Sequence, residues 1–260
     1  VISSQSSDVN HVKSLVKKAS KSDVSILVQG EQGTGKKELA RSIHLASKRQ
    51  KYPFMHYECG ALPAEIIERE LFGIATAEFE EVGAIEVADK GTLYLEDIAK
   101  LPLHLQSRLV KLLDDNQVPS LLSAHGPKNN FRLMVSNVTP LNLEVKNGNL
   151  REDLFYQISI VTINVPPLRT RLVDLSALVD FYLKRYNEKN EDHISSNPRV
   201  ISVLSQYSFP GNLRELANLI EQLAALTTSK KIEVGDLPPN ILPDSSWSLK
   251  QNKNEHFSLS

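Results

Sequence analysis

A glycine-rich segment that ends in lysine offers the clearest chemistry in this chain: Gly30-Glu31-Gln32-Gly33-Thr34-Gly35-Lys36. Glycines at this spacing let the backbone turn tightly and point successive N–H groups inward, where they can bind phosphate oxygens. Lys36 would reach the β- and γ-phosphates of a nucleotide as a point charge. Many such loops continue with a serine or threonine for magnesium, whereas this chain continues with Lys37. The segment predicts a phosphate-binding P-loop, and a glycine-rich surface turn is the alternative.

Two adjacent carboxylates offer the chemistry that a P-loop needs beside it. Glu96 and Asp97 directly follow the apolar run Leu93-Tyr94-Leu95. In a parallel sheet, the carboxyl end of such a strand lies next to the phosphate loop. One of the two acids would hold Mg²⁺, often through water, and the other would orient or deprotonate the attacking water; Glu96 is the expected metal ligand. The alternative is that both acids merely cap the next helix.

The elements that must position these groups alternate between strand and helix. Such alternation is typical of a parallel sheet that helices cover on both faces. Strands are expected at 24–28, 91–95, 131–137 and 158–165, and helices at 8–20, 38–47 and 103–113.

After two consecutive prolines, Pro166-Pro167, the pattern becomes helical only, with helices expected at 173–186, 198–205 and 213–226. The tail is polar, with scattered apolar residues. We therefore expect an α/β nucleotide-binding subdomain over residues 1–165, a small all-helical subdomain over 166–243 and a linker or disordered tail over 244–260.

The composition of the 260 residues excludes several classes of protein. The formal net charge of −1 provides no global basic field that would attract nucleic acid or a membrane, although a local patch remains an option. Cys59 is the sole cysteine, so no internal disulfide can form. No apolar run approaches membrane-spanning length and the first residues lack a signal-peptide profile, so we expect a cytoplasmic protein without a membrane partner.

The chain resembles the AAA+ domain of bacterial enhancer-binding proteins, the transcription activators that remodel sigma-54 RNA polymerase. The resemblance spans about residues 5 to 243. It implies a P-loop AAA+ fold, ATP and Mg²⁺ as ligands, and self-assembly into a dimer or hexameric ring. It also implies RNA polymerase holoenzyme as a partner, and DNA binding through a C-terminal helix-turn-helix domain that is not in this chain. Besides the P-loop, the resemblance is carried in the family's order by Glu70-Leu71-Phe72-Gly73, Gly91-Thr92-Leu93-Tyr94-Leu95-Glu96-Asp97-Ile98, Arg151-Glu152-Asp153-Leu154-Phe155-Tyr156, Pro167-Leu168-Arg169 and Phe209-Pro210-Gly211-Asn212-Leu213-Arg214-Glu215-Leu216.

The resemblance also implies roles for single residues. Asn137 matches the polar sensor that reads the γ-phosphate, and Arg214 matches the second sensor, which couples nucleotide state to subdomain angle. Arg151 matches the first of two arginine fingers offered to a neighbouring subunit's nucleotide; a solvated surface arginine is the alternative. The implied catalytic residues are Glu96, Asp97, Asn137 and Arg151, and the implied nucleotide-binding residues are Gly30, Glu31, Gln32, Gly33, Thr34, Gly35, Lys36, Lys37 and Arg214.

Three positions depart from the family pattern. The segment Ile74 to Gly83 is shorter than the family's loop, which contains Gly-Ala-Phe-Thr-Gly-Ala and touches the sigma factor. The acids read Glu96-Asp97 where the family reads Asp-Glu, a carboxylate shift of roughly one ångström that can cost about a hundredfold in rate. Gln157 replaces the second arginine finger and cannot neutralise developing phosphoryl charge. These changes favour a regulator that binds nucleotide and assembles but hydrolyses ATP weakly or not at all and does not remodel sigma-54; the alternative is an active sigma-54-dependent ATPase.

A subset of the family, the regulators of biofilm matrix and flagella, responds to cyclic di-GMP bound near the P-loop. Two arginines implicated in one such regulator match Arg41 and Arg185. Arginine suits both the phosphates and the guanines of this ligand. Ser42 stands where that regulator carries asparagine, and its Leu-Phe-Arg-Ser segment would align at or just before Val1. Cyclic di-GMP is thus a further candidate ligand, and two ordinary solvated helix arginines are the alternative.

Overall fold

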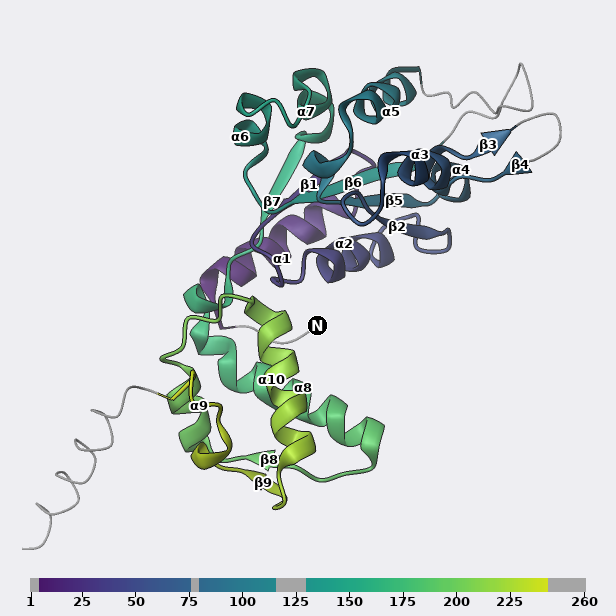
Figure 1. The fold of residues 1–260 in the computed structure, drawn as a ribbon. Coiled ribbons are helices and arrows are strands. Elements are labelled where there is room, and N and C mark those ends of the chain that lie inside the picture. The colour runs from purple at the N-terminus through teal and green to yellow at the C-terminus, as the bar shows by residue number, and fades with distance from the viewer. Residues whose placement is uncertain (1–4, 76–79, 116–129, 243–260) are drawn as a thin grey trace, which may run out of the picture. The chain divides into compact units, whose positions relative to one another are not determined.

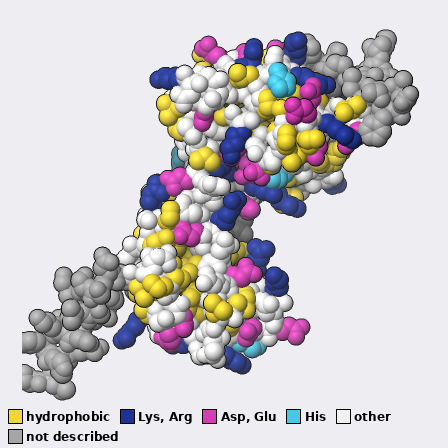
Figure 2. Space-filling view, in the orientation of Figure 1, with side chains coloured by type: hydrophobic (Ala, Val, Ile, Leu, Met, Phe, Trp, Pro, Cys, Tyr) yellow, Lys and Arg dark blue, Asp and Glu magenta, His cyan; other side chains and the backbone are white. Residues whose placement is uncertain are grey.

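The computed structural model describes residues 5–75, 80–115 and 130–242, which form two compact units (Figure 1). One unit comprises Asp8–Pro166. The described residues from Pro167 onward, with the short segment before Asp8, form the other. On the face drawn in Figure 2, lysine and arginine side chains lie intermingled with aspartate and glutamate over each unit. None of the described helices is long and apolar enough to cross a membrane.

The first unit is built on a five-stranded parallel sheet with the order β2-β5-β6-β1-β7. The register places Gln29 beside Asn137 and Glu58 beside Glu96, so polar residues from four strands meet at the carboxyl edge of the sheet. This edge is where α/β proteins bind their ligands. The strands are β1 (Ile26–Gln29), β2 (Phe54–Glu58), β5 (Thr92–Glu96), β6 (Arg132–Asn137) and β7 (Val161–Asn164), and a separate antiparallel pair comprises β3 (Ile74–Ala75) and β4 (Glu80–Glu81).

Helices cover both faces of this sheet, because side chains along a strand point alternately to opposite sides. Ile26 and Val28 pack with α1 and α2, whereas Leu27 between them packs with helices on the other face. The predicted parallel sheet covered by helices is therefore confirmed. The helices are α1 (Ser7–Ala19), α2 (Lys36–Leu45), α3 (Ala64–Phe72), α4 (Ala84–Val87), the 3₁₀ helix η1 (Ile98–Lys100), α5 (Leu103–Asp115), α6 (Leu141–Lys146) and α7 (Glu152–Ile158).

The structure differs from the sequence-based expectation at two strands. The strand expected at 158–165 is limited to β7, because Ile158 is the last residue of α7 and lies in the hydrophobic core. β2 was not predicted at all. It lies at the edge of the sheet and carries His56 and Glu58 on alternate positions, so it lacks the continuous apolar run of a central strand.

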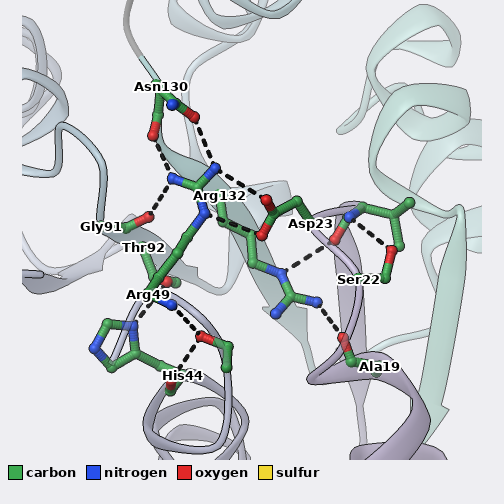
Figure 3. Close-up of polar contacts among 11 residues, drawn as sticks. Ala19, Ser22, Asp23, His44, Arg49, Gly91, Thr92, Asn130 and Arg132 are labelled. Carbon is green, nitrogen blue, oxygen red and sulfur yellow. Dashed lines mark hydrogen bonds and ion pairs between the residues drawn. The ribbon is translucent and has the colours of Figure 1, made fainter. Parts of the chain in front are cut away.

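Two arginines form hydrogen bonds that link the chain segments at the amino-terminal edge of the sheet (Figure 3). Arg132, the first residue of β6, is 1% exposed and donates from Nη2 to the Ala19 carbonyl at 2.7 Å and from Nε to the Val24 carbonyl at 3.3 Å. Arg49 pairs with Asp23 and donates to further groups shown in Figure 3. The cluster ties the turn between α1 and β1 to β6 and to the residues after α2.

The second unit is a helical bundle with its own apolar core. Its helices are α8 (Leu175–Asn190), α9 (Pro198–Leu204), α10 (Asn212–Leu226) and the 3₁₀ turns η2 (Leu168–Thr170), η3 (Leu172–Asp174) and η4 (Val234–Asp236), and one short parallel ladder joins β8 (Ser195–Ser196) to β9 (Lys231–Ile232). The fully buried Asn212 begins α10 and accepts a hydrogen bond from the Leu168 backbone N–H at 2.8 Å through Oδ1. The tail predicted at 244–260 lies outside the described residues.

Candidate nucleotide-binding site

The P-loop adopts a conformation that its glycines make accessible. Gly33 and Gly35 have φ angles of 76° and 94°, in the left-handed region that side chains disfavour. Thr34 closes the loop on itself, because its hydroxyl donates to the Glu31 carbonyl at 2.8 Å. Gly35 directly precedes α2, so the first N–H groups and the positive dipole end of that helix lie at the loop.

Lys36 is the first residue of α2 and is only 5% exposed. Its ammonium donates to the carbonyls of Gly30 at 3.0 Å and Glu31 at 3.2 Å. The charge is therefore held inside the loop and not at the surface. A phosphate oxygen that entered the loop would be a stronger acceptor for this ammonium than a neutral carbonyl.

Glu96 ends β5 and is engaged by a residue that sequence reasoning missed. Its Oε2 accepts a hydrogen bond from His56 Nε2 at 2.8 Å. This bond holds the pKa of Glu96 below its ordinary value, although partial burial acts in the opposite direction. The positive charges of Lys36 and Lys37 lower the same pKa further. The P-loop lysines and Glu96 thus share one electrostatic environment, in which Glu96 stays ionised.

Aromatic side chains set the position of the His56 ring. His56 stacks on Tyr94 of the adjacent strand with ring centroids 5.5 Å apart, and Tyr94 also stacks on Phe54 at 6.0 Å. The Tyr94 hydroxyl donates to Ser136 Oγ at 2.8 Å. The alternation of Phe54 and His56 along β2 was the available sequence signal, since it places both rings on one face of the strand.

Asp97 leaves the sheet in a left-handed conformation, with φ 56° and ψ 55°. Aspartate tolerates this region better than most residues. Its Oδ2 accepts a bond from Lys100 Nζ at 2.8 Å, and this bond raises the pKa of Lys100. Sequence reasoning missed Lys100 as well. The carboxylate thus engages a side chain and not the N–H groups of a helix, which argues against a mere capping role.

Asn137 lies at the end of β6 and is 4% exposed. Its Nδ2 donates to the Thr139 carbonyl at 2.8 Å, and its Oδ1 accepts from the Ala99 N–H at 3.3 Å. Through these bonds Asn137 joins the end of its strand to the turn that follows the two acids. The P-loop, Glu96, Asp97 and Asn137 therefore lie along one edge of the sheet.

Arg151 precedes α7 and is exposed. Its guanidinium forms two bonds with Asp153, from Nε to Oδ1 at 3.0 Å and from Nη2 to Oδ2 at 2.7 Å. Its backbone N–H is anchored on the buried side chain of Gln106 at 2.9 Å. The geometry fits an arginine finger on a fixed base and a solvated surface arginine equally. Gln157, at the second finger position, donates to Asp114.

The other predicted binding residues are exposed arginines on helices. Arg41 lies on α2 of the first unit, whereas Arg185 on α8 and Arg214 on α10 belong to the second unit. Their contacts with a ligand remain predictions. The segment expected to replace the sigma-contacting loop lies partly outside the described residues, including Glu78; its described ends form β3 and β4.

Comparisons with known proteins agree with this fold. A family model for the sigma-54 interaction domain matches residues 2–164, and one for the AAA+ ATPase lid domain matches residues 169–254. Regulatory protein AtoC of Escherichia coli (strain K12) is 38% identical over 226 residues, which cover 85% of this chain and 49% of AtoC. The Nif-specific regulatory protein of Rhizobium meliloti (strain 1021) is 36% identical over 90% of this chain and 44% of its own length.

Solved structures point the same way. NtrX from Brucella abortus in complex with ATP has a TM-score of 0.82 and 30% identity, covering 97% of this chain and 61% of that chain. NtrX in complex with ADP also has a TM-score of 0.82, with 31% identity, covering 93% of this chain and 56% of that chain. The chain spans about half the length of AtoC and of the Nif-specific protein. It belongs to the sigma-54 interaction domain family of transcriptional regulators, with an AAA+ ATPase lid domain following the nucleotide-binding fold.

Proposed function

We propose that this chain is the ATP-binding module of a bacterial transcriptional regulator and that it hydrolyses ATP slowly. The observation that carries the proposal is the closed P-loop, in which the buried Lys36 ammonium is held by loop carbonyls beside the ionised Glu96. Such a loop offers inward N–H groups, a helix dipole and a positive charge to phosphates. NtrX, solved with ATP, supports the same assignment by similarity.

Magnesium would depend largely on the nucleotide. The described residues contain no group of three or more histidine, cysteine or acidic side chains that could hold a metal ion. The usual hydroxyl ligand after the P-loop lysine is replaced by Lys37. Mg²⁺ typically keeps several waters and binds through one or two carboxylates plus substrate phosphates, so Glu96 with the phosphates is the fitting donor set.

Slow hydrolysis is proposed because both acids are bound to cationic or imidazole side chains and the second finger position lacks an arginine. Glu96 is bound to His56, and Asp97 is bound to Lys100. Gln157 supplies no positive charge to the transition state. The competing function, an efficient ATPase that drives sigma-54 promoter opening, is favoured by the match to the sigma-54 interaction domain.

We expect the whole regulator to act in the cytoplasm, to self-assemble as a dimer or hexameric ring, and to contact RNA polymerase holoenzyme, with DNA bound by a domain outside this chain. The family match and the regulators AtoC and Nif-specific protein support these expectations. Analytical ultracentrifugation with and without ATP tests the self-assembly.

Calorimetric titration with ATP, paired with phosphate release, tests the central proposal. Wild-type protein should bind ATP, and Lys36→Ala should abolish binding while the circular dichroism spectrum stays unchanged, since the removed ammonium donates to carbonyls of the loop itself. Lys51→Ala, the same change at an exposed lysine of the same unit, is the matched control. Equal ATP affinity in wild type and Lys36→Ala would refute the proposed site.

Cyclic di-GMP is the second ligand that we propose, with Arg41 and Arg185 as its contacts. Both arginines are exposed on helices and available to a ligand. Each substitution to alanine should weaken binding by about 1–3 kcal/mol, the scale of a charge-assisted hydrogen bond. Calorimetry with a protein extended before Val1 is the test; no binding, or binding indifferent to both substitutions, removes this ligand.

A further inference from the structure

The carboxylate of Asp97 is engaged at the position where the proposed function requires it to act. In the hydrolysis of ATP, the oxygen of water bonds to the γ-phosphorus, the bond from that phosphorus to the bridging oxygen breaks, and ADP departs. The proton released by the water passes to a carboxylate such as Asp97 and then to solvent. An acid whose oxygen accepts a bond from an ammonium is held in the direction of that bond, and it has fewer lone pairs left to orient water.

Lys100 is placed to make this bond persist. It ends the 3₁₀ helix that starts after Asp97, and its backbone N–H donates to the Asp97 carbonyl at 2.8 Å. The side-chain bond between Nζ and Asp97 Oδ2 is also 2.8 Å long. Backbone and side chain of Lys100 therefore both bind the same residue, and the short turn leaves little freedom between them.

The aliphatic stem of Lys100 packs against the backbone of Gly60. A Cβ atom at Gly60 would lie 2.3 Å from Cδ of Lys100, so the stem rests directly against the glycine backbone. Glu58 and Glu96 add negative potential that favours the charged form of Lys100. The ammonium is thus directed toward the acid pair by packing as well as by charge.

We infer that Lys100 is a positioning residue that holds the Asp97 carboxylate away from the attacking water and so slows ATP hydrolysis. The inference rests on the proposed function, because it needs ATP in the P-loop. It concerns the rate of the chemical step and not the affinity for nucleotide. Lys100 is not a catalytic residue here; if it were, its removal would lower turnover.

Four variants test the inference, with phosphate release read as kcat and KM for ATP. Lys100→Met keeps the stem and removes the charge. Gly60→Ala keeps the charge but displaces the stem, and its φ lies outside the left-handed region, so alanine fits the backbone. Lys100→Arg retains a positive charge, and Lys51→Met removes the charge of an exposed lysine elsewhere in the same unit.

We expect Lys100→Met and Gly60→Ala to raise kcat by about two- to fivefold with KM unchanged, the scale of one partly exposed ion pair. The scale is modest because the Lys100 side chain is 59% exposed, whereas that of Asp97 is 15% exposed. Lys100→Arg and Lys51→Met should leave kcat at the wild-type value.

Turnover of Lys100→Met at or below the wild-type value overturns the inference, as does an equal rise in Lys51→Met. Calorimetry with ATP on the same samples separates this result from failure of the proposed function. Intact ATP binding with unchanged turnover removes only the role of Lys100. Absent ATP binding in the wild type removes the proposed function and this inference with it.

Discussion

Arg132 provides the sharpest test of how the first unit is held together, through the substitution Arg132→Met. Methionine retains an unbranched stem but loses the guanidinium that binds the Ala19 and Val24 carbonyls. The Ala19 carbonyl keeps a second donor, the Ser22 N–H at 3.1 Å. Most of the lost stability therefore comes from the Val24 carbonyl, which loses its bond to Arg132.

The magnitude follows from two opposing terms. The partly buried Val24 carbonyl, once it loses this donor, costs about 1–2 kcal/mol, and the lost bond to Ala19 adds about 1 kcal/mol. Against this, burial lowers the pKa of Arg132, which shows that the charged form is penalised by desolvation. Its Nη1 is also buried without a hydrogen-bond partner among the described residues. We expect a net loss of about 2 kcal/mol, or a fall in melting temperature of roughly 4–8 °C for a unit of this size.

Native-state hydrogen exchange is the appropriate assay, because peptides from β1 and β6 report on the first unit separately from the second. Arg41→Met, the same change at an exposed arginine of the same unit, should fall within about 0.5 kcal/mol of wild type. Unchanged or increased protection in Arg132→Met would refute the reasoning, since desolvation of the guanidinium would then outweigh its hydrogen bonds.

Three further predictions concern the acids and the sigma factor. The exchange of both acids, Glu96→Asp with Asp97→Glu, combined with Gln157→Arg should raise ATP turnover more than the exchanged acids or Gln157→Arg alone, because the groups act on one transition state. Wild-type turnover near the enzyme median of about 10 per second would contradict the premise that this protein hydrolyses ATP slowly. The pKa of Glu96 is lowered from its ordinary 4.5, so the stability it contributes is present above that pH and is lost as the pH falls through the lowered folded value. His56→Gln should therefore move the acid-unfolding midpoint, measured by circular dichroism, to higher pH, and an unchanged midpoint would show that His56 does not stabilise the carboxylate. With an ATP transition-state analogue, the protein should form no stable complex with sigma-54, because the segment 74–83 is short and carries Glu80 and Glu81; a trapped complex on a native gel would show otherwise.

The parts of the site that the sequence predicted are those determined by local backbone chemistry. Gly33 and Gly35 are required by their φ angles, and Lys36 follows them at a fixed distance along the chain. The acids were predictable because a buried strand precedes them directly. Such features depend on neighbours within a few residues, which a single sequence displays.

The parts that were missed depend on contacts between distant residues. His56 reaches Glu96 across 40 positions of sequence, and β2 as an edge strand gave only a weak apolar signal. Lys100 is close in sequence to Asp97, but its role depends on the left-handed turn at Asp97 and on packing against Gly60. Side-chain partners of this kind are set by tertiary structure, which overrides local pattern.

The buried bond from Leu168 to Asn212 has a mechanical consequence for α10. It fixes the first turn of the helix to the chain entering the second unit, so any tilt of α10 would pivot near Asn212. Over its 15 residues the helix extends about 22 Å at 1.5 Å per residue, so a tilt of about 10° would displace its far end by about 4 Å. Arg214, only two residues from Asn212, would move by about half an ångström for the same tilt and rise per residue. A tilt that moved Arg214 by no more than the change in one hydrogen bond would therefore move the far end of the helix, near Leu226, by several ångströms.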